Sequence, residues 1–196
     1  APENTVAALK KGLEHRVDEL EFDVRVTKDG TVILAHNKTV TDAAGNSLVV
    51  ANHTYKEIKA HKPDLATLQE ALDAINKQAV AHIEIKRNEP VAPIATIIKN
   101  YLGRGWKDDN FSLGSKHQPT LRAAHTALPN IQKVVINAWS GILAQRRAKQ
   151  VNTKRISMRS WFLWRGFIAA MHHGGYELYA YTLNDPKKAR LWAKYG

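Results

Sequence analysis

Hydrophobic and charged side chains alternate along residues 20–26, which is the period of a β-strand. Glu21, Asp23 and Arg25 occupy the positions between the apolar residues. Successive side chains of a strand point to opposite faces, so we expect one apolar face that packs on a core and one charged face. The two carboxylates are therefore predicted to lie side by side. The apolar members of the pattern are Leu20, Phe22, Val24 and Val26.

A hairpin is expected directly after this strand. Asp29 and Gly30 form a common two-residue turn, and residues 32–35 supply an apolar return strand. If these two residues are the centre of the turn, counting back along both strands places His36 opposite Asp23. Directly opposed residues share a face, with Cβ atoms about 5 Å apart. The pattern thus predicts that a histidine meets the carboxylates, whereas a three-residue loop would move His36 to the other face.

Helical and strand-like segments alternate over the rest of the chain. Apolar spacing and capping residues predict helices over residues 2–16, 67–78, 90–102, 118–128, 142–151, 161–173 and 187–195. Strands are expected over residues 80–86, 110–115, 132–137, 155–158 and 177–183. Residues 37–64 are polar, and we interpret them as irregular with a short helix at 55–60. This alternation predicts an α/β fold, a mainly parallel (β/α) barrel of TIM type, as one domain over residues 1–196.

A second charged face follows from the segment at residues 80–86. Ile83 and Ile85 face one way, while Glu84 and Lys86 share the other face with a histidine. Barrel enzymes carry their chemistry at the carboxyl ends of strands, so these side chains and those of the first hairpin can meet there. Three carboxylates suit a hard cation such as Mg²⁺ or Ca²⁺, and a nearby lysine could hold a phosphoryl oxygen.

The overall composition narrows the classes of function. The chain contains no cysteine, which excludes disulfides, thiolate metal sites and a cysteine nucleophile, and suits a reducing compartment. We therefore expect a cytoplasmic protein. No apolar run approaches the roughly 20 residues of a membrane span, and the first residues lack the pattern of a signal peptide. The formal charge of +11 favours anionic partners such as phosphate esters.

Five segments, taken in order and spacing, resemble the glycerophosphodiester phosphodiesterase family. They are APENT at 1–5, ELEFDVRVTKDG at 19–30, VILAHN at 32–37, HIEIK at 82–86 and YAYTLND at 179–185. The resemblance covers nearly the whole chain. It implies a TIM-type barrel that hydrolyses a small anionic glycerophosphodiester to sn-glycerol 3-phosphate and an alcohol with a divalent cation. In that mechanism two histidines transfer protons, and a cyclic phosphate is opened by water.

The resemblance also assigns roles to individual residues. Glu21, Asp23 and Glu84 match the metal ligands, His36 matches one of the two catalytic histidines, and Lys86 matches a lysine that contacts phosphate. Two further pairs of residues belong to matched motifs. Glu3 and Asn4 fall in a motif that shapes a loop of the site, and Tyr181 and Asn184 fall in a motif that lines the site from a late strand.

Three departures from the family pattern bear on activity. The family's first strand and its His-Arg-Gly motif precede the segment that begins at Ala1, and its last strand follows Gly196. We therefore expect these residues to be a portion of a longer enzyme, with a barrel that lacks its first and last strands and turns over slowly without the second histidine. Asn37 stands where the family usually has aspartate, which removes a charge beside His36.

Three other functions fit parts of the sequence. A barrel that binds phosphodiesters without catalysis would fit the missing histidine. A nucleic-acid module would fit the basic run at 145–155, but the chain has no recognised motif for it, and we do not expect nucleic-acid binding. A sphingomyelinase-D-like phospholipase would need further ligands, and the remaining candidates lack ligand spacing. These candidates are His53, His117, His125, His172 and His173, which we interpret as surface or core residues.

Overall fold

The structure is a computed structural model that describes residues 1–137 and 139–195. Its helices are α1 (Val6–Glu14), α2 (Tyr55–His61), α3 (Leu68–Ile75), α4 (Val91–Gly103), α5 (Gln118–Ala127), α6 (Gly141–Lys149), α7 (Arg165–His173) and α8 (Pro186–Ala193). Its strands are β1 (Glu19–Val26), β2 (Val32–Leu34), β3 (Thr39–Thr41), β4 (Ser47–Val49), β5 (Val80–Ile85), β6 (Phe111–Ser115), β7 (Gln132–Ile136), β8 (Arg155–Arg159) and β9 (Glu177–Tyr181). Three short 3-10 turns complete the chain: η1 (Val50–Asn52), η2 (Asp108–Asn110) and η3 (Ser160–Phe162).

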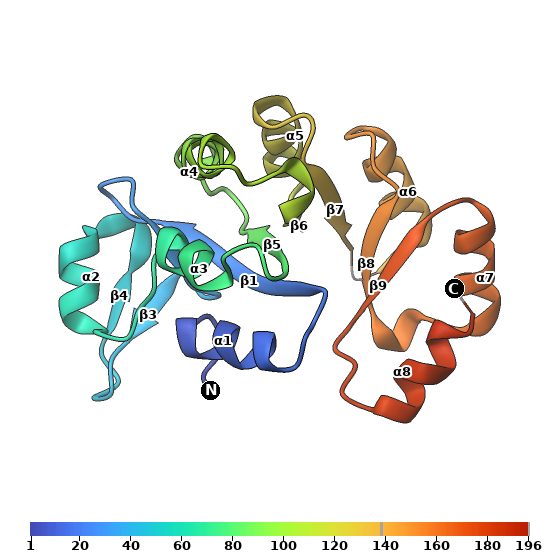
Figure 1. The fold of residues 1–196 in the computed structure, drawn as a ribbon, viewed down its shortest axis with the longest axis horizontal. Helices are drawn as coiled ribbons and strands as arrows, with labels where there is room; N and C mark the ends of the chain where they lie inside the picture. The colour runs from blue at the N-terminus through green and yellow to red at the C-terminus, as the bar shows by residue number, and fades with distance from the viewer. Residues whose placement is uncertain (138, 196) are drawn as a thin grey trace.

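A seven-stranded sheet in the order β2-β1-β5-β6-β7-β8-β9 organises the fold. All neighbours from β1 to β9 are parallel, and β2 pairs antiparallel with β1 at one edge. The sheet bends into an arc with α4, α5, α6 and α7 along its outer side (Figure 1). Each expected parallel strand is confirmed. Within the described residues β1 and β9 are not hydrogen-bonded to each other, so the barrel wall is open between them.

The apolar faces of the strands form the core, as the alternating pattern predicts. Phe22, Val24, Ile83 and Ile85 are almost fully buried in a cluster that also contains apolar residues of α3 and α4. The opposite faces of β1 and β5 point into the concave side of the arc, and Asp23 and Glu84 are buried there as well. The sheet therefore presents its charged face to the interior of the barrel.

The register predicted for the first hairpin is wrong. Val24 pairs with Leu34 and Val26 with Val32, so the loop contains three residues rather than two. Thr27 closes this loop, since its backbone N–H donates to the Thr31 carbonyl at 2.9 Å, and Gly30 takes a positive φ of 83° at the last loop position. A three-residue loop of this kind needs a residue with positive φ, and glycine supplies it without steric strain.

Two other segments differ from expectation. Residues 37–64 are more ordered than predicted, because β3 and β4 form a small antiparallel hairpin and α2 packs on it through Ile58. The helix expected from residue 161 begins only at Arg165, because the chain first makes the 3-10 turn η3 and an extended residue at Trp164. In the described part of the chain, none of the helices has the length and apolar character that crossing a membrane requires.

Candidate active site

A cavity of about 470 Å³ opens at the carboxyl ends of the parallel strands. Its walls come from β1, β5 and β7 to β9 and from the loops that follow β2 and β6. In the described residues, charged side chains of β1 and β5 stand next to each other because these strands pair in parallel, with Asp23 directly beside Glu84. This placement is the one that barrel enzymes use for catalysis.

Three carboxylates converge in this cavity. One oxygen atom from each of Glu21, Asp23 and Glu84 lies within 4.8 Å of the other two. Glu21 and Asp23 are two residues apart on β1, and Glu84 is supplied by the neighbouring strand. Oxygen ligands at this spacing fit a hard divalent cation, so the chemistry of the donor set agrees with the metal expected from the sequence.

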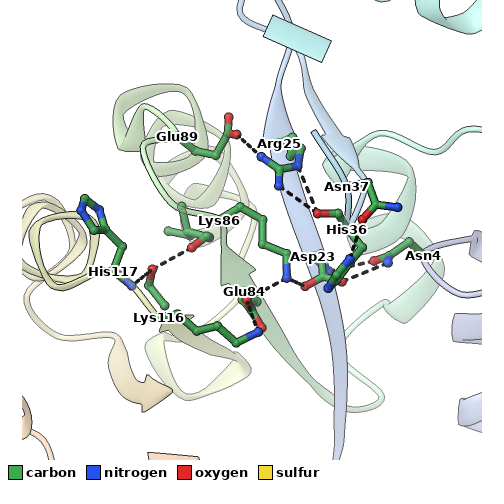
Figure 2. Close-up of polar contacts among 12 residues, drawn as sticks. Asn4, Asp23, Arg25, His36, Asn37, Glu84, Lys86, Glu89, Lys116 and His117 are labelled. Carbon is green, nitrogen blue, oxygen red and sulfur yellow. Dashed lines mark hydrogen bonds and ion pairs between the residues drawn. The ribbon is translucent and has the colours of Figure 1, made fainter. Parts of the chain in front are cut away.

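Two lysines balance part of this negative charge. The Lys86 ammonium contacts Asp23 and lies 2.8 Å from Glu84 Oε1, and the Lys116 ammonium lies 3.3 Å from the same Glu84 oxygen (Figure 2). Burial by itself lowers the pKa of Lys86, but its hydrogen bonds to the two carboxylates outweigh burial and raise that pKa. Lys86 is therefore held as a cation beside the carboxylate cluster.

Asn4 holds Asp23 in place from the N-terminal segment. Its side-chain amide donates to Asp23 Oδ2 at 3.1 Å, and its Oδ1 accepts the backbone N–H of Asp23 at 2.8 Å (Figure 2). Asn4 itself has a positive φ of 57°, which asparagine tolerates better than most residues. The neighbouring Glu3 lines the cavity. The segment APENT is thus tied to the carboxylate cluster by two hydrogen bonds.

Glu21 combines partial burial with the closeness of two other carboxylates. Its side chain is open to the cavity, yet protein surrounds it on most sides, and the resulting loss of solvation, together with the charges of Asp23 and Glu84, raises its pKa to about 7. A bound cation would compete with this proton, because a metal ligand must be deprotonated.

Cation binding is therefore expected to depend on pH. Below pH 7 Glu21 carries a proton that the cation must displace, so the affinity for Mg²⁺ or Ca²⁺ should fall by about tenfold for each further pH unit. Calorimetric titration in two buffers of different ionisation enthalpy would count the protons released. Wild-type protein at pH 6 should release close to one proton per cation, and Glu21→Gln should release none from this position. Equal proton release by both proteins would contradict this assignment.

His36 reaches the cavity by a different route from the predicted one. The chain leaves the sheet after Leu34, and Arg25 holds the next segment by donating from Nη2 to the His36 carbonyl at 2.9 Å. A buried ion pair of 2.7 Å between Arg25 and Glu89 fixes the guanidinium. The His36 side chain lines the cavity, and its Nδ1 lies 3.0 Å from Asn37 Oδ1. Asn37 can therefore orient the imidazole without a charge.

The remaining sequence-predicted residues divide into two groups. Tyr181 lines the cavity, whereas Asn184 is exposed beyond the end of β9 and is not among the lining residues. The five histidines that we interpreted as non-ligands also lie outside the cavity lining, and Figure 2 shows His117 pointing away from the carboxylates. Within the described chain, the structure thus brings together all predicted site residues except Asn184 and the loop residue Asn4, which acts through Asp23.

Sequence reasoning missed several side chains of the cavity. Lys116 directly follows β6, a position at the carboxyl end of a strand that could have been recognised. Glu19 and His82 lie one layer deeper, with His82 Nδ1 3.4 Å from Glu19 Oε2 and 3.0 Å from Ser112 Oγ. Tyr179 donates to Glu19 Oε1 at 3.4 Å across the open side of the sheet. Contacts between distant strands of this kind leave no local signal.

Comparison with known proteins gives one consistent match. The model of the Glycerophosphoryl diester phosphodiesterase family matches residues 1–196. A glycerophosphodiester phosphodiesterase of Caldanaerobacter subterraneus subsp. tengcongensis is 29% identical over 74% of this chain, and one of Bacillus altitudinis is 25% identical over 69%. The chain spans 62% and 61% of the lengths of these two relatives.

Solved structures show the same architecture. A phosphodiesterase of Oleispira antarctica, solved in complex with the product sn-glycerol-3-phosphate, superposes with a TM-score of 0.85 at 20% identity, covering 100% of this chain and 85% of that one. A glycerophosphodiester phosphodiesterase of Thermotoga maritima gives a TM-score of 0.77 at 20% identity, with 100% and 86% coverage. At these identities the likeness establishes the fold, and it confirms the predicted TIM-type class.

Proposed function

Because the chain belongs to the Glycerophosphoryl diester phosphodiesterase family, a family of hydrolases, we propose that its cavity hydrolyses a glycerophosphodiester to sn-glycerol 3-phosphate and an alcohol. The observation that carries this proposal is the meeting of the carboxylate cluster, Lys86 and His36 in one cavity at the carboxyl ends of the strands. Each component alone is common in proteins, but together they supply cation binding, phosphate binding and proton transfer.

Different residues of the cavity would bind the cation and the phosphate of the substrate. Glu21, Asp23 and Glu84 would hold Mg²⁺ or Ca²⁺, which when bound neutralises and polarises the phosphate. Lys86 contacts two of these carboxylates, so it stands where an ammonium can also reach a phosphoryl oxygen. Lys116 supports the same task from the other side of Glu84. Asn4 keeps Asp23 oriented through its two hydrogen bonds.

His36 is the group that transfers a proton. When its Nδ1–H donates to Asn37 Oδ1, the other ring nitrogen, Nε2, is unprotonated and can accept a proton from a hydroxyl of the substrate. Asparagine fixes this tautomer but does not stabilise the imidazolium that forms, as a carboxylate would. The rate should therefore be lower than with aspartate at position 37.

Product analysis tests this function directly. Wild-type protein with glycerophosphocholine and Mg²⁺ or Ca²⁺ should form glycerol 3-phosphate. ³¹P NMR spectra recorded over hours would detect this product even if turnover is slow. A chelator should abolish the release. Saturable binding of glycerophosphocholine without any product would instead identify a binding protein, and cleavage confined to sphingomyelin or lysophosphatidylcholine would identify a phospholipase. Either result would overturn the proposal.

A further inference from the structure

An exposed aromatic cluster borders the cavity. It consists of Trp139, Trp161, Phe162 and Trp164, which we call the aromatic rim. The three tryptophans are 65%, 62% and 64% exposed, although large apolar side chains are usually buried. The rings of Trp139, Trp161 and Phe162 pack together, since Trp161 lies 4.2 Å from Phe162 and 5.8 Å from Trp139 between ring centroids, and Trp164 follows two residues after Phe162. Three of the four rim residues therefore form a continuous apolar surface rather than a set of isolated side chains.

The rim lies at the mouth of the proposed active site. It is formed by the segments that follow β7 and β8, two strands whose residues Ile136 and Ser157 line the cavity. Ser160, which opens η3, donates to the carbonyl of the cavity residue Thr182 at 2.9 Å. Two aliphatic side chains in the first turn of α6 extend the apolar surface: Ile142, which is 70% exposed, and Leu143, which is 51% exposed.

The chain segment that carries the rim is basic. Residues 111–176 contain ten lysines and arginines and no aspartate or glutamate. The Arg159 guanidinium lies 5.6 Å from the centre of the Trp139 ring, and Arg146 and Arg165 are exposed on α6 and α7. A contiguous apolar surface of this kind marks an interaction site, and its basic surroundings call for an anionic partner.

The chemistry of the rim fits a lipid surface better than a nucleic acid. Tryptophan concentrates at the boundary between lipid headgroups and acyl chains, and basic residues beside it attract anionic headgroups. Stacking with bases uses free ring faces, and part of the ring surface of Trp139 is already used in edge-to-face contacts with Trp161 and Phe162, at interplanar angles of 89° and 78°. Exposed Ile142 and Leu143 add apolar area that a bilayer can bury and that base stacking does not use.

We propose that the aromatic rim docks the mouth of the cavity onto an anionic lipid bilayer. The rim tryptophans enter the headgroup boundary, and Arg146, Arg159 and Arg165 contact the anionic headgroups. Docking in this orientation brings the cavity to the place where phospholipid-derived diesters arise. The binding itself depends only on the rim and its charges, so it can be tested separately from catalysis.

Vesicle binding tests this proposal. The wild-type chain should sediment with vesicles of phosphatidylcholine and phosphatidylglycerol, and its tryptophan emission should shift to the blue and be quenched by lipids brominated near the headgroup. Trp139→Ala combined with Trp161→Ala should weaken binding by at least about tenfold. Leu191→Ala, which removes an exposed apolar side chain of α8, should leave binding unchanged. Circular dichroism would verify that each variant is folded.

The contribution of the basic residues to vesicle binding can be tested with a matched pair of double variants. Arg146→Gln combined with Arg165→Gln should lower affinity by about fivefold for each charge removed. Lys10→Gln combined with Lys99→Gln removes the same charge from exposed positions on α1 and α4 and should have less than about a twofold effect. The proposal is overturned if wild-type protein does not bind the vesicles, if bound protein shows no quenching, or if duplex DNA binds instead and is insensitive to the tryptophan substitutions.

Discussion

Replacing Glu84 by glutamine is expected to lower the affinity for Mg²⁺ or Ca²⁺ by at least about 100-fold, because loss of a residue that merely supports a ligand already costs about 10- to 100-fold. Glu84 is the only member of the carboxylate cluster that β5 supplies, and it is buried between two lysines. Glutamine keeps its size and one oxygen but removes the charge. Isothermal titration of the metal-free protein would measure the change.

Two comparisons make this result specific. Glu14→Gln removes a carboxylate from the surface of α1, where Glu14 forms an ion pair with Lys11, and should leave the cation affinity unchanged within about twofold. Lys86→Met should not weaken cation binding as Glu84→Gln does, since it removes a competing positive charge next to Asp23. Undiminished cation affinity in Glu84→Gln would show that the cluster does not hold the metal.

Replacing His36 by glutamine is expected to slow the formation of glycerol 3-phosphate by about 10²- to 10⁴-fold, which is the usual contribution of one positioned proton transfer. His36 lies in an irregular segment and is exposed to the cavity, so its replacement should not affect the core. It makes no contact with the carboxylate cluster among the described interactions, and cation affinity should therefore remain within about twofold. Rates measured with protein in excess over glycerophosphocholine would detect slow single turnovers.

A variant of another histidine serves as the control, because it shows whether the loss of any imidazole side chain slows the reaction. His172→Gln changes an exposed residue of α7 that does not line the cavity, and it should keep the wild-type rate. Asn37→Asp places a carboxylate beside the ring, where Asn37 Oδ1 lies 3.0 Å from His36 Nδ1, and is expected to raise the rate because a carboxylate stabilises the imidazolium that forms. Wild-type turnover in His36→Gln would remove His36 from the mechanism.

The amino-acid sequence by itself determined the strands of the parallel sheet, most of the helices and the residues of the carboxylate cluster. Burial on one face of a parallel strand imposes a period of two, and this period is visible in residues 20–26 and 80–86. The pairing of β1 with β5 follows from chain order, so Asp23 and Glu84 could be expected at the same edge. The capping box of Thr67 and Glu70, which begins the helix predicted at 67–78, is likewise a local signal that the structure confirms.

Only the tertiary structure decided how the other groups reach the cavity. A one-residue change in loop length reversed the predicted face of His36, and the contacts of Arg25 with Glu89 and with the His36 carbonyl, not strand pairing, hold that segment. Asn4 meets Asp23 across 19 residues, and Tyr179 meets Glu19 across 160. Such contacts depend on the curvature of the whole sheet, which no local pattern of hydrophobic and polar residues encodes.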